Sequence, residues 1–142
     1  MSLPGSEDCI LDHIAVAVTS ISTSKKVYED LGIIFSGAIE EVKEQKVLTA
    51  FAQIDQNAHL ELLEPTSHES AIHKFIQTKG EGIHHVCFKV SDVKNKTIEL
   101  SLKGYKFIYP EPRIGAGGCL VNFIHPKSTG GVLIEISQRP LI

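Results

Sequence analysis

Short runs of Ile, Val, Leu and Ala recur along this chain, and turn-forming residues separate them. Such runs, rich in β-branched residues and bounded by Gly, Pro, Ser, Asn or Asp, predict strands. Helices are predicted where a capping Ser or Asp precedes apolar residues at helical spacing and a glycine follows. The predicted strands are residues 10–18, 33–42, 46–54, 58–63, 83–90, 105–109, 119–124 and 131–137. The first predicted helix is capped by Ser20 or Ser22 and runs to about Leu31. The second covers residues 71–78 and is capped by Ser70. The third is opened by Ser91 or Asp92 and closed by Gly104.

The order strand, helix, strand, strand, strand occurs twice. The segment LDHIAVAV at 11–18 aligns with IHHVCFKV at 83–90, so that His13 falls on His85 at a shift of 85 − 13 = 72. Further along, Glu61 falls on Glu135 at a shift of 74. Two βαβββ modules bury both sheet faces only by pairing. The pattern therefore predicts one α+β domain, residues 1–142, in which two modules form a curved mixed sheet or half-barrel with a cleft.

The module boundaries follow from the same pattern. Module one covers residues 10–64 and module two residues 82–138. Residues 70–79 form a helix that links the two. A repeated unit of which each copy supplies half of a polar constellation indicates a site shared between the copies.

Strand periodicity predicts which way the repeated polar residues point. Side chains alternate across a strand, so Leu60 and Leu62 face the helix-covered core while Glu61 faces the cleft. His13, His85 and Glu135 follow the same rule. Two imidazoles and two carboxylates suit a divalent ion such as Co²⁺, Ni²⁺, Zn²⁺ or Mn²⁺. A single strand histidine is more often a hydrogen-bonded residue than a ligand, but the repetition of all four favours a metal site.

The other histidines and the cysteines are assigned structural or surface roles. His84 must face away from its neighbour His85 in a strand, and we expect His59, His68 and His73 at the surface. Cys87 has the parity of His85 and is expected to be a buried, inert thiol. The three cysteines Cys9, Cys87 and Cys119 form no CxxC pair, which argues against a disulfide framework and fits a reducing cytoplasm.

Composition excludes several classes of function. The net charge is −3 with 14 Lys and Arg residues, which gives no reason to expect nucleic acid as a partner. No apolar run approaches the roughly 20 residues of a membrane span, so no membrane association is expected. With 42% hydrophobic residues, the chain is typical of a folded domain.

Four motifs resemble one known family. They are LDHIAVAV at 11–18, LELLEP at 60–65, GEGIHHVCFKV at 80–90 and FIHPKSTGGVLIEI at 123–136. With the paired modules, they resemble the vicinal oxygen chelate, or glyoxalase, superfamily, and within it most closely the methylmalonyl-CoA epimerases. The similarity extends over residues 11–138.

The resemblance implies a metal site and a reaction. The family's ligands fall on His13, Glu61, His85 and Glu135. It implies a homodimer that binds an acyl-CoA and, usually with cobalt, interconverts (R)- and (S)-methylmalonyl-CoA. Charge that develops on the enolate oxygen of the thioester then meets a fixed cation.

The groups that transfer the proton are harder to identify from the sequence than the metal ligands. One base removes the α-proton and another returns it from the opposite face. Several of the bacterial epimerases that the chain resembles carry a glutamate base a few residues after an EQ pair; with Glu44-Gln45 as that pair, the position here is Thr49. We therefore expect Glu135 to act as the base and Glu61 to flank the substrate. Glu44 is the second candidate for the base. Lys127, in the HPKSTGG run, is a candidate contact for the CoA phosphates.

Three alternatives remain. Glyoxalase I of the same superfamily uses a His/Glu/His/Glu set, and only the HPKSTGGVLIE and LLEP motifs favour the epimerase. Ring-cleaving dioxygenases use two histidines and one carboxylate, so the additional Glu61 and the short chain argue against them. Non-catalytic resistance-type binding modules have no need of four ligands.

Overall fold

The computed structural model describes residues 9–138. These residues form two compact units. The N-terminal unit is His13–His84, and the C-terminal unit consists of the residues before His13 together with those from His85 on.

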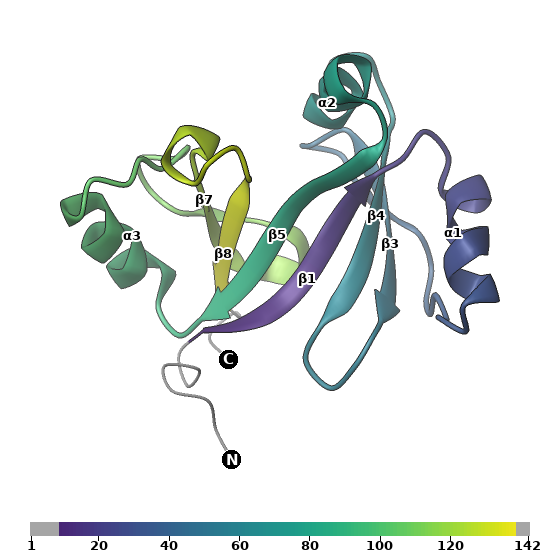
Figure 1. The fold of residues 1–142 in the computed structure, drawn as a ribbon, viewed down its shortest axis with the longest axis horizontal. Coiled ribbons are helices and arrows are strands. Elements are labelled where there is room, and N and C mark those ends of the chain that lie inside the picture. Colours follow the sequence, from purple (N-terminus) through teal and green to yellow (C-terminus); the bar gives the residue numbers. More distant parts are fainter. Residues whose placement is uncertain (1–8, 139–142) are drawn as a thin grey trace. The chain divides into compact units, whose positions relative to one another are not determined.

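The N-terminal unit contains most of the first predicted module and the linking helix. Its strands are ordered β2-β3-β4-β1, with β1 parallel to β4 and the other neighbours antiparallel (Figure 1). The elements are β1 Cys9–Ala17, α1 Ile21–Asp30, β2 Glu40–Val42, β3 Val47–Gln53, β4 His59–Pro65 and α2 Ala71–Lys79.

The C-terminal unit repeats this arrangement. Its strands are ordered β5-β8-β7-β6, with β5 parallel to β8 and the remaining pairs antiparallel. The elements are β5 Gly82–Val90, α3 Val93–Leu102, β6 Arg113–Ile114, β7 Leu120–Ile124 and β8 Ile134–Gln138, with short 3₁₀ helices η2 Ala116–Gly118 and η3 Pro126–Ser128. The predicted α+β class and the duplicated βαβββ order are confirmed.

In each unit one face of the sheet packs against the helix that follows the first strand. In the N-terminal unit, Leu60 and Leu62 of β4 join Val18 and Ile21 in a core that includes Tyr28 of α1. In the C-terminal unit, the corresponding core joins three buried residues, Val90, Val93 and Ile136. The alternation of side chains then turns the residues between these aliphatics to the other face.

Helices α1 and α3 begin in the same way. Ser20 caps α1 and Asp92 caps α3, each with a side-chain oxygen that accepts from a backbone N–H of the first turn. The first N–H of each helix donates to a side chain at the end of the unit's parallel strand, Ile21 N to Glu64 Oε1 at 2.8 Å and Val93 N to Gln138 Oε1 at 2.8 Å. Each helix is therefore anchored to its sheet through a buried end, which satisfies a donor that would otherwise be orphaned.

Two predicted strands are much shorter than expected. Of 33–42, only β2 and an isolated bridge between Phe35 and Ala52 pair with β3. Of 105–109, only a bridge between Phe107 and Ile124 remains. Gly37, with φ of 82°, leaves the extended region and lets the chain turn away from the sheet edge. β8 also begins at Ile134 rather than at 131; Gly131, the first residue of the predicted strand, has a φ of 97° and is not extended.

No helix in residues 9–138 has the length and apolar character that a membrane span requires.

Candidate functional site

The first predicted pair of ligands meets on the face opposite α1. Parallel pairing of β1 with β4 sets Ala15 opposite Glu61, so His13 lies diagonally next to the carboxylate. His13 Nε2 is 3.3 Å from Glu61 Oε2, and the two residues are only 8% and 7% exposed. A carboxylate as buried as this one needs a polar partner, and His13 is one.

The second pair has the same construction. In the parallel pairing of β5 with β8, Cys87 lies opposite Glu135. His85 Nε2 is 3.0 Å from Glu135 Oε1, with exposures of 7% and 8%. Since Ala15 and Cys87 are related by the shift of 72, the two units place their histidine and glutamate at equivalent positions in equivalent registers.

The geometry of each pair fits two neighbouring ligands of one ion. The Nε2 and carboxylate oxygen are 3.3 Å apart in the first pair and 3.0 Å apart in the second, so both donor atoms of each pair are close enough to contact one ion. Imidazole nitrogen and carboxylate oxygen are donors that Co²⁺, Ni²⁺, Zn²⁺ and Mn²⁺ accept. The residues present are therefore suited to a divalent ion.

A phenylalanine lies opposite each glutamate. Phe51 of β3 pairs with Glu61, and Phe123 of β7 pairs with Glu135. The Phe123 ring meets the ring of His85 edge-on, with centroids 5.7 Å apart. The shift 123 − 51 = 72 would have revealed this pair in the sequence, but we did not identify it there.

His59 is not the surface residue that we expected. It is half-buried on β4, opposite His13, and the centroids of the two imidazole rings are 4.9 Å apart. Its ring is also 5.2 Å from that of Phe51. His59 therefore adds a third aromatic ring beside the first histidine–glutamate pair.

The candidate bases occupy different environments. Thr49 is buried, and its hydroxyl donates to the backbone carbonyl of Glu40 at 3.2 Å. It lies opposite Leu63, which places it on the same face as Glu61. Glu44 lies in the exposed turn after β2. Glu61 and Glu135 are the buried carboxylates among these candidates.

Lys127 lies in the exposed 3₁₀ helix η3 of the C-terminal unit. Its backbone N–H donates to Nδ1 of His125 at 3.1 Å, which fixes the start of this turn. The side chain is exposed to solvent and can contact an anionic ligand.

The remaining residues of interest have packing roles. His84 packs edge-on against Phe75 of α2, with centroids 5.0 Å apart. Cys87 is fully buried, and all three cysteines are free thiols. His68 is exposed and stacks on the half-buried His73, with centroids 4.5 Å apart.

The duplicated βαβββ modules, each with a buried histidine–glutamate pair, are matched by one protein family model. The chain belongs to the glyoxalase/bleomycin resistance protein/dioxygenase superfamily, whose family model matches residues 12–123. The resemblance found in the sequence is thereby confirmed at the level of the superfamily.

Within the superfamily, this chain is similar to methylmalonyl-CoA epimerases. It is 35% identical over 131 residues to the mitochondrial methylmalonyl-CoA epimerase of Dictyostelium discoideum, which covers 91% of this chain and 78% of that protein. It is also 40% identical over 129 residues to the uncharacterised protein YqjC of Bacillus subtilis, with 90% and 91% covered. A methylmalonyl-CoA epimerase solved with methylmalonyl-CoA and ammonium superposes with a TM-score of 0.88 at 32% identity, over 96% of this chain and 98% of that one. The prediction of an epimerase-like enzyme is confirmed.

Proposed function

We propose that this protein interconverts the (R) and (S) epimers of methylmalonyl-CoA and that His13, Glu61, His85 and Glu135 together hold one divalent ion. The observation that carries the proposal is the duplicated pair: two units present a buried imidazole and a buried carboxylate in the same strand register. The epimerases named among the relatives support the choice of substrate.

When bound, the ion supplies a positive charge that stabilises the negative charge developing on the thioester oxygen. The protein's own residues must hold that charge in place and exclude water. The apolar neighbours of the two pairs suit this task, since Ala15 and Cys87, opposite the two glutamates, are fully buried. A low local dielectric strengthens every electrostatic interaction with the substrate.

Epimerisation at the α-carbon needs a general base on one face of the substrate and a general acid on the other. In the proposed reaction a carboxylate oxygen of Glu135 takes the α-proton, and the C–H electron pair moves toward the thioester carbonyl. Glu61, which would have to leave the ion and carry a proton for this step, then returns that proton to the opposite face. Glu44 remains the second candidate for the base, because Thr49 has no carboxyl group.

The CoA portion would be held by charge and by exposed loops. Lys127 offers an exposed ammonium group that can pair with a phosphate of CoA. Cobalt as the ion and a homodimer as the assembly stay predictions.

The test is isotope exchange. The cobalt-loaded protein is incubated with (S)-methylmalonyl-CoA in deuterium oxide, and mass spectrometry measures deuterium at the α-carbon together with formation of the (R) epimer. We expect exchange and epimerisation with the wild type and neither with His85→Ala. His84→Ala is the matched control, because the neighbouring imidazole packs against α2 instead.

Two results would overturn the proposal. One is exchange that His85→Ala leaves unchanged, since the reaction would then not depend on the site. The other is turnover of the methylglyoxal–glutathione hemithioacetal, but not of methylmalonyl-CoA, by the same cobalt- or nickel-loaded sample. That outcome would assign the protein to the glyoxalase I reaction.

A further inference from the structure

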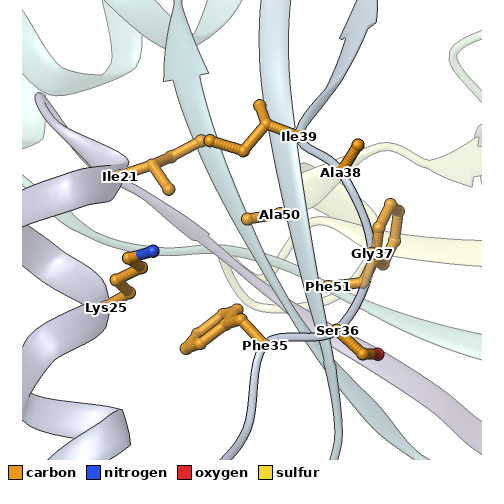
Figure 2. A pocket seen from close by; sticks show the side chains of 9 residues that line it. All are labelled: Ile21, Lys25, Phe35, Ser36, Gly37, Ala38, Ile39, Ala50 and Phe51. Atoms are coloured by element: carbon orange, nitrogen blue, oxygen red, sulfur yellow. The ribbon is translucent and has the colours of Figure 1, made fainter.

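A small pocket lies in the N-terminal unit, between α1, the segment 35–39 and β3. Its volume is about 50 Å³. Figure 2 shows Lys25 reaching from α1 toward the strand that carries Ala50, with Phe35 and Ile39 on the facing segment. The lining residues are Ile21, Lys25, Phe35, Ser36, Gly37, Ala38, Ile39, Ala50 and Phe51.

The duplication shows what occupies the corresponding place in the C-terminal unit. At the shift of 72, Lys25 corresponds to Thr97, Gly37 to Tyr109 and Ala50 to Asn122. The Asn122 amide joins these elements by three hydrogen bonds. It accepts from Tyr109 N at 3.2 Å, donates to Tyr109 O at 3.1 Å and donates to Thr97 Oγ1 at 3.4 Å. A carboxamide therefore fills the space between helix, segment and strand in that unit.

The N-terminal unit lacks this carboxamide. Ala50 contributes only a methyl group. The backbone of Gly37 therefore has no side-chain amide as a hydrogen-bond partner, whereas the backbone of Tyr109 has that of Asn122. Lys25 brings an ammonium group where Thr97 has a hydroxyl. Among residues 9–138, no carboxylate forms an ion pair with Lys25, although the neighbouring Lys26 pairs with Asp30 at 3.3 Å. The pocket thus combines a missing polar bridge with an unpaired cation.

Size and lining define the chemistry of an occupant. One water needs about 10–15 Å³ of such space, so 50 Å³ accommodates about four or five non-hydrogen atoms. The walls are mostly aliphatic or aromatic, and the one charge is positive. A tetrahedral oxyanion such as phosphate would leave most of its oxygens against apolar walls without hydrogen bonds, which is costly. A carboxylate with a short alkyl chain fits both parts of the lining, because its charged end can pair with the lysine and its alkyl end can contact the apolar walls.

We propose that this pocket binds a short-chain monocarboxylate of the size of propionate. Its carboxylate pairs with Lys25 and accepts from the backbone N–H of the segment at Gly37, and its alkyl end lies against Ile21. The Lys25 end of this site lies on the α1 face, where Ala50 packs with Leu62, whereas Glu61 faces the other side of the sheet; Phe51, opposite Glu61, also lines the pocket. The proposal does not depend on the proposed function.

The test is a titration of the ¹⁵N-labelled full-length protein with sodium propionate at constant ionic strength, followed by amide chemical shifts. We expect saturable shifts at Gly37 and Ala38 with a dissociation constant on the order of millimolar, as for a ligand of this size. Lys25→Met should weaken binding about tenfold, because a charge-assisted bond is lost. Lys26→Met, which removes a charge from the same helix outside the pocket, should leave the constant unchanged.

Two further arms test shape and charge. Ala50→Asn should abolish binding, since the new amide would fill the pocket as Asn122 does in the C-terminal unit. Propionamide, the neutral analogue of the same shape, should bind about tenfold more weakly than propionate. Absent or unsaturable shifts, equal binding of propionamide, or equal loss in Lys25→Met and Lys26→Met would each overturn the proposal. If Ala50→Asn does not fold, the comparison of Lys25→Met with Lys26→Met and the propionamide titration still test the proposal.

Discussion

Asn122 is fully buried, and four hydrogen bonds satisfy its side chain. Besides those to Tyr109 and Thr97, its Oδ1 accepts from Phe123 N at 2.8 Å. Asn122→Ala would leave the backbone N–H and carbonyl of Tyr109 without these partners and open a cavity. We expect a loss of about 2–4 kcal/mol in the free energy of unfolding, measured by urea denaturation.

Asn57→Ala is the control for this prediction. Asn57 lies in the exposed turn between β3 and β4, where its backbone N–H, rather than its side chain, donates to Asp55 Oδ1. The substitution should change stability by less than about 0.5 kcal/mol. Equal effects of the two substitutions would mean that the Asn122 network contributes little to stability.

Sequence reasoning identified individual site residues only where the repeat gave a second copy. His13 and His85, or Glu61 and Glu135, support one another through a common shift. His59 has no such counterpart, because the residue at 59 + 74 = 133 is a leucine. Its position beside His13 follows from the register of two parallel strands that are 46 residues apart, which periodicity cannot supply.

At the scale of elements, the anchor of α1 can be tested with a substitution taken from the other unit. Glu64 accepts from the first N–H of α1, and Gln138 does the same for α3. Glu64→Met removes the acceptor and should lower the free energy of unfolding by about 1–2 kcal/mol. Glu64→Gln keeps an acceptor oxygen and should cost much less in the same urea experiment. A Gln variant as unstable as the Met variant would contradict the anchoring role.

The connection between Thr19 and Glu81 should make stability depend on pH. The Thr19 hydroxyl donates to Glu81 Oε1 at 2.6 Å and the Thr19 backbone N–H donates to the same atom at 2.7 Å, and these bonds hold the pKa of Glu81 below its ordinary value of 4.5. A carboxyl with a lowered pKa in the folded state stabilises the fold above its unfolded pKa. This contribution is lost as the pH falls through the folded pKa.

Glu81→Gln should therefore lower the free energy of unfolding at pH 7, by less than about 1 kcal/mol because the group is exposed. The difference from the wild type should shrink as the pH falls below 4.5. Unfolding curves in urea at pH 7 and pH 3 measure it. Thr19→Val, which removes the hydroxyl donor, should show the same trend, and a difference that is equal at both pH values would exclude the linkage.

Element boundaries were predictable where caps and core periodicity agreed, and not elsewhere. Ser20, Ser70 and Asp92 cap the helices as their sequence context predicts. The strands 33–42 and 105–109 were overestimated because both are outer segments with little pairing: 33–42 pairs with β3 only at the Phe35 bridge and through β2, and 105–109 only at the Phe107 bridge. Apolar composition alone does not distinguish such a segment from a paired strand.

At the scale of the whole chain, the duplication made the fold predictable but hid how the units differ. The bridges of Phe35 and Phe107, the helix anchors and the histidine–glutamate pairs all recur. The alanine at position 50 does not recur, because the other copy carries Asn122 there, whose amide bonds to Tyr109 and Thr97. Alanine and asparagine are both compatible with a buried strand position, so the sequence pattern does not reveal this difference. It is recognised only from the side-chain packing in the structure.

The number of ions per chain tests whether the two pairs act as one site. If all four residues hold a single ion, the purified protein should bind one Co²⁺ per chain by calorimetry. Glu61→Gln and Glu135→Gln should then each weaken that binding strongly. Cobalt at 100 times its dissociation constant should stabilise the wild type by about 2.7 kcal/mol and raise the melting temperature by roughly 10 °C.

If each pair instead bound its own ion, the wild type would bind two ions, and each single variant would retain one ion with half of the cobalt signal. That outcome would separate the pairs and remove the basis for proton transfer by opposing carboxylates around one substrate.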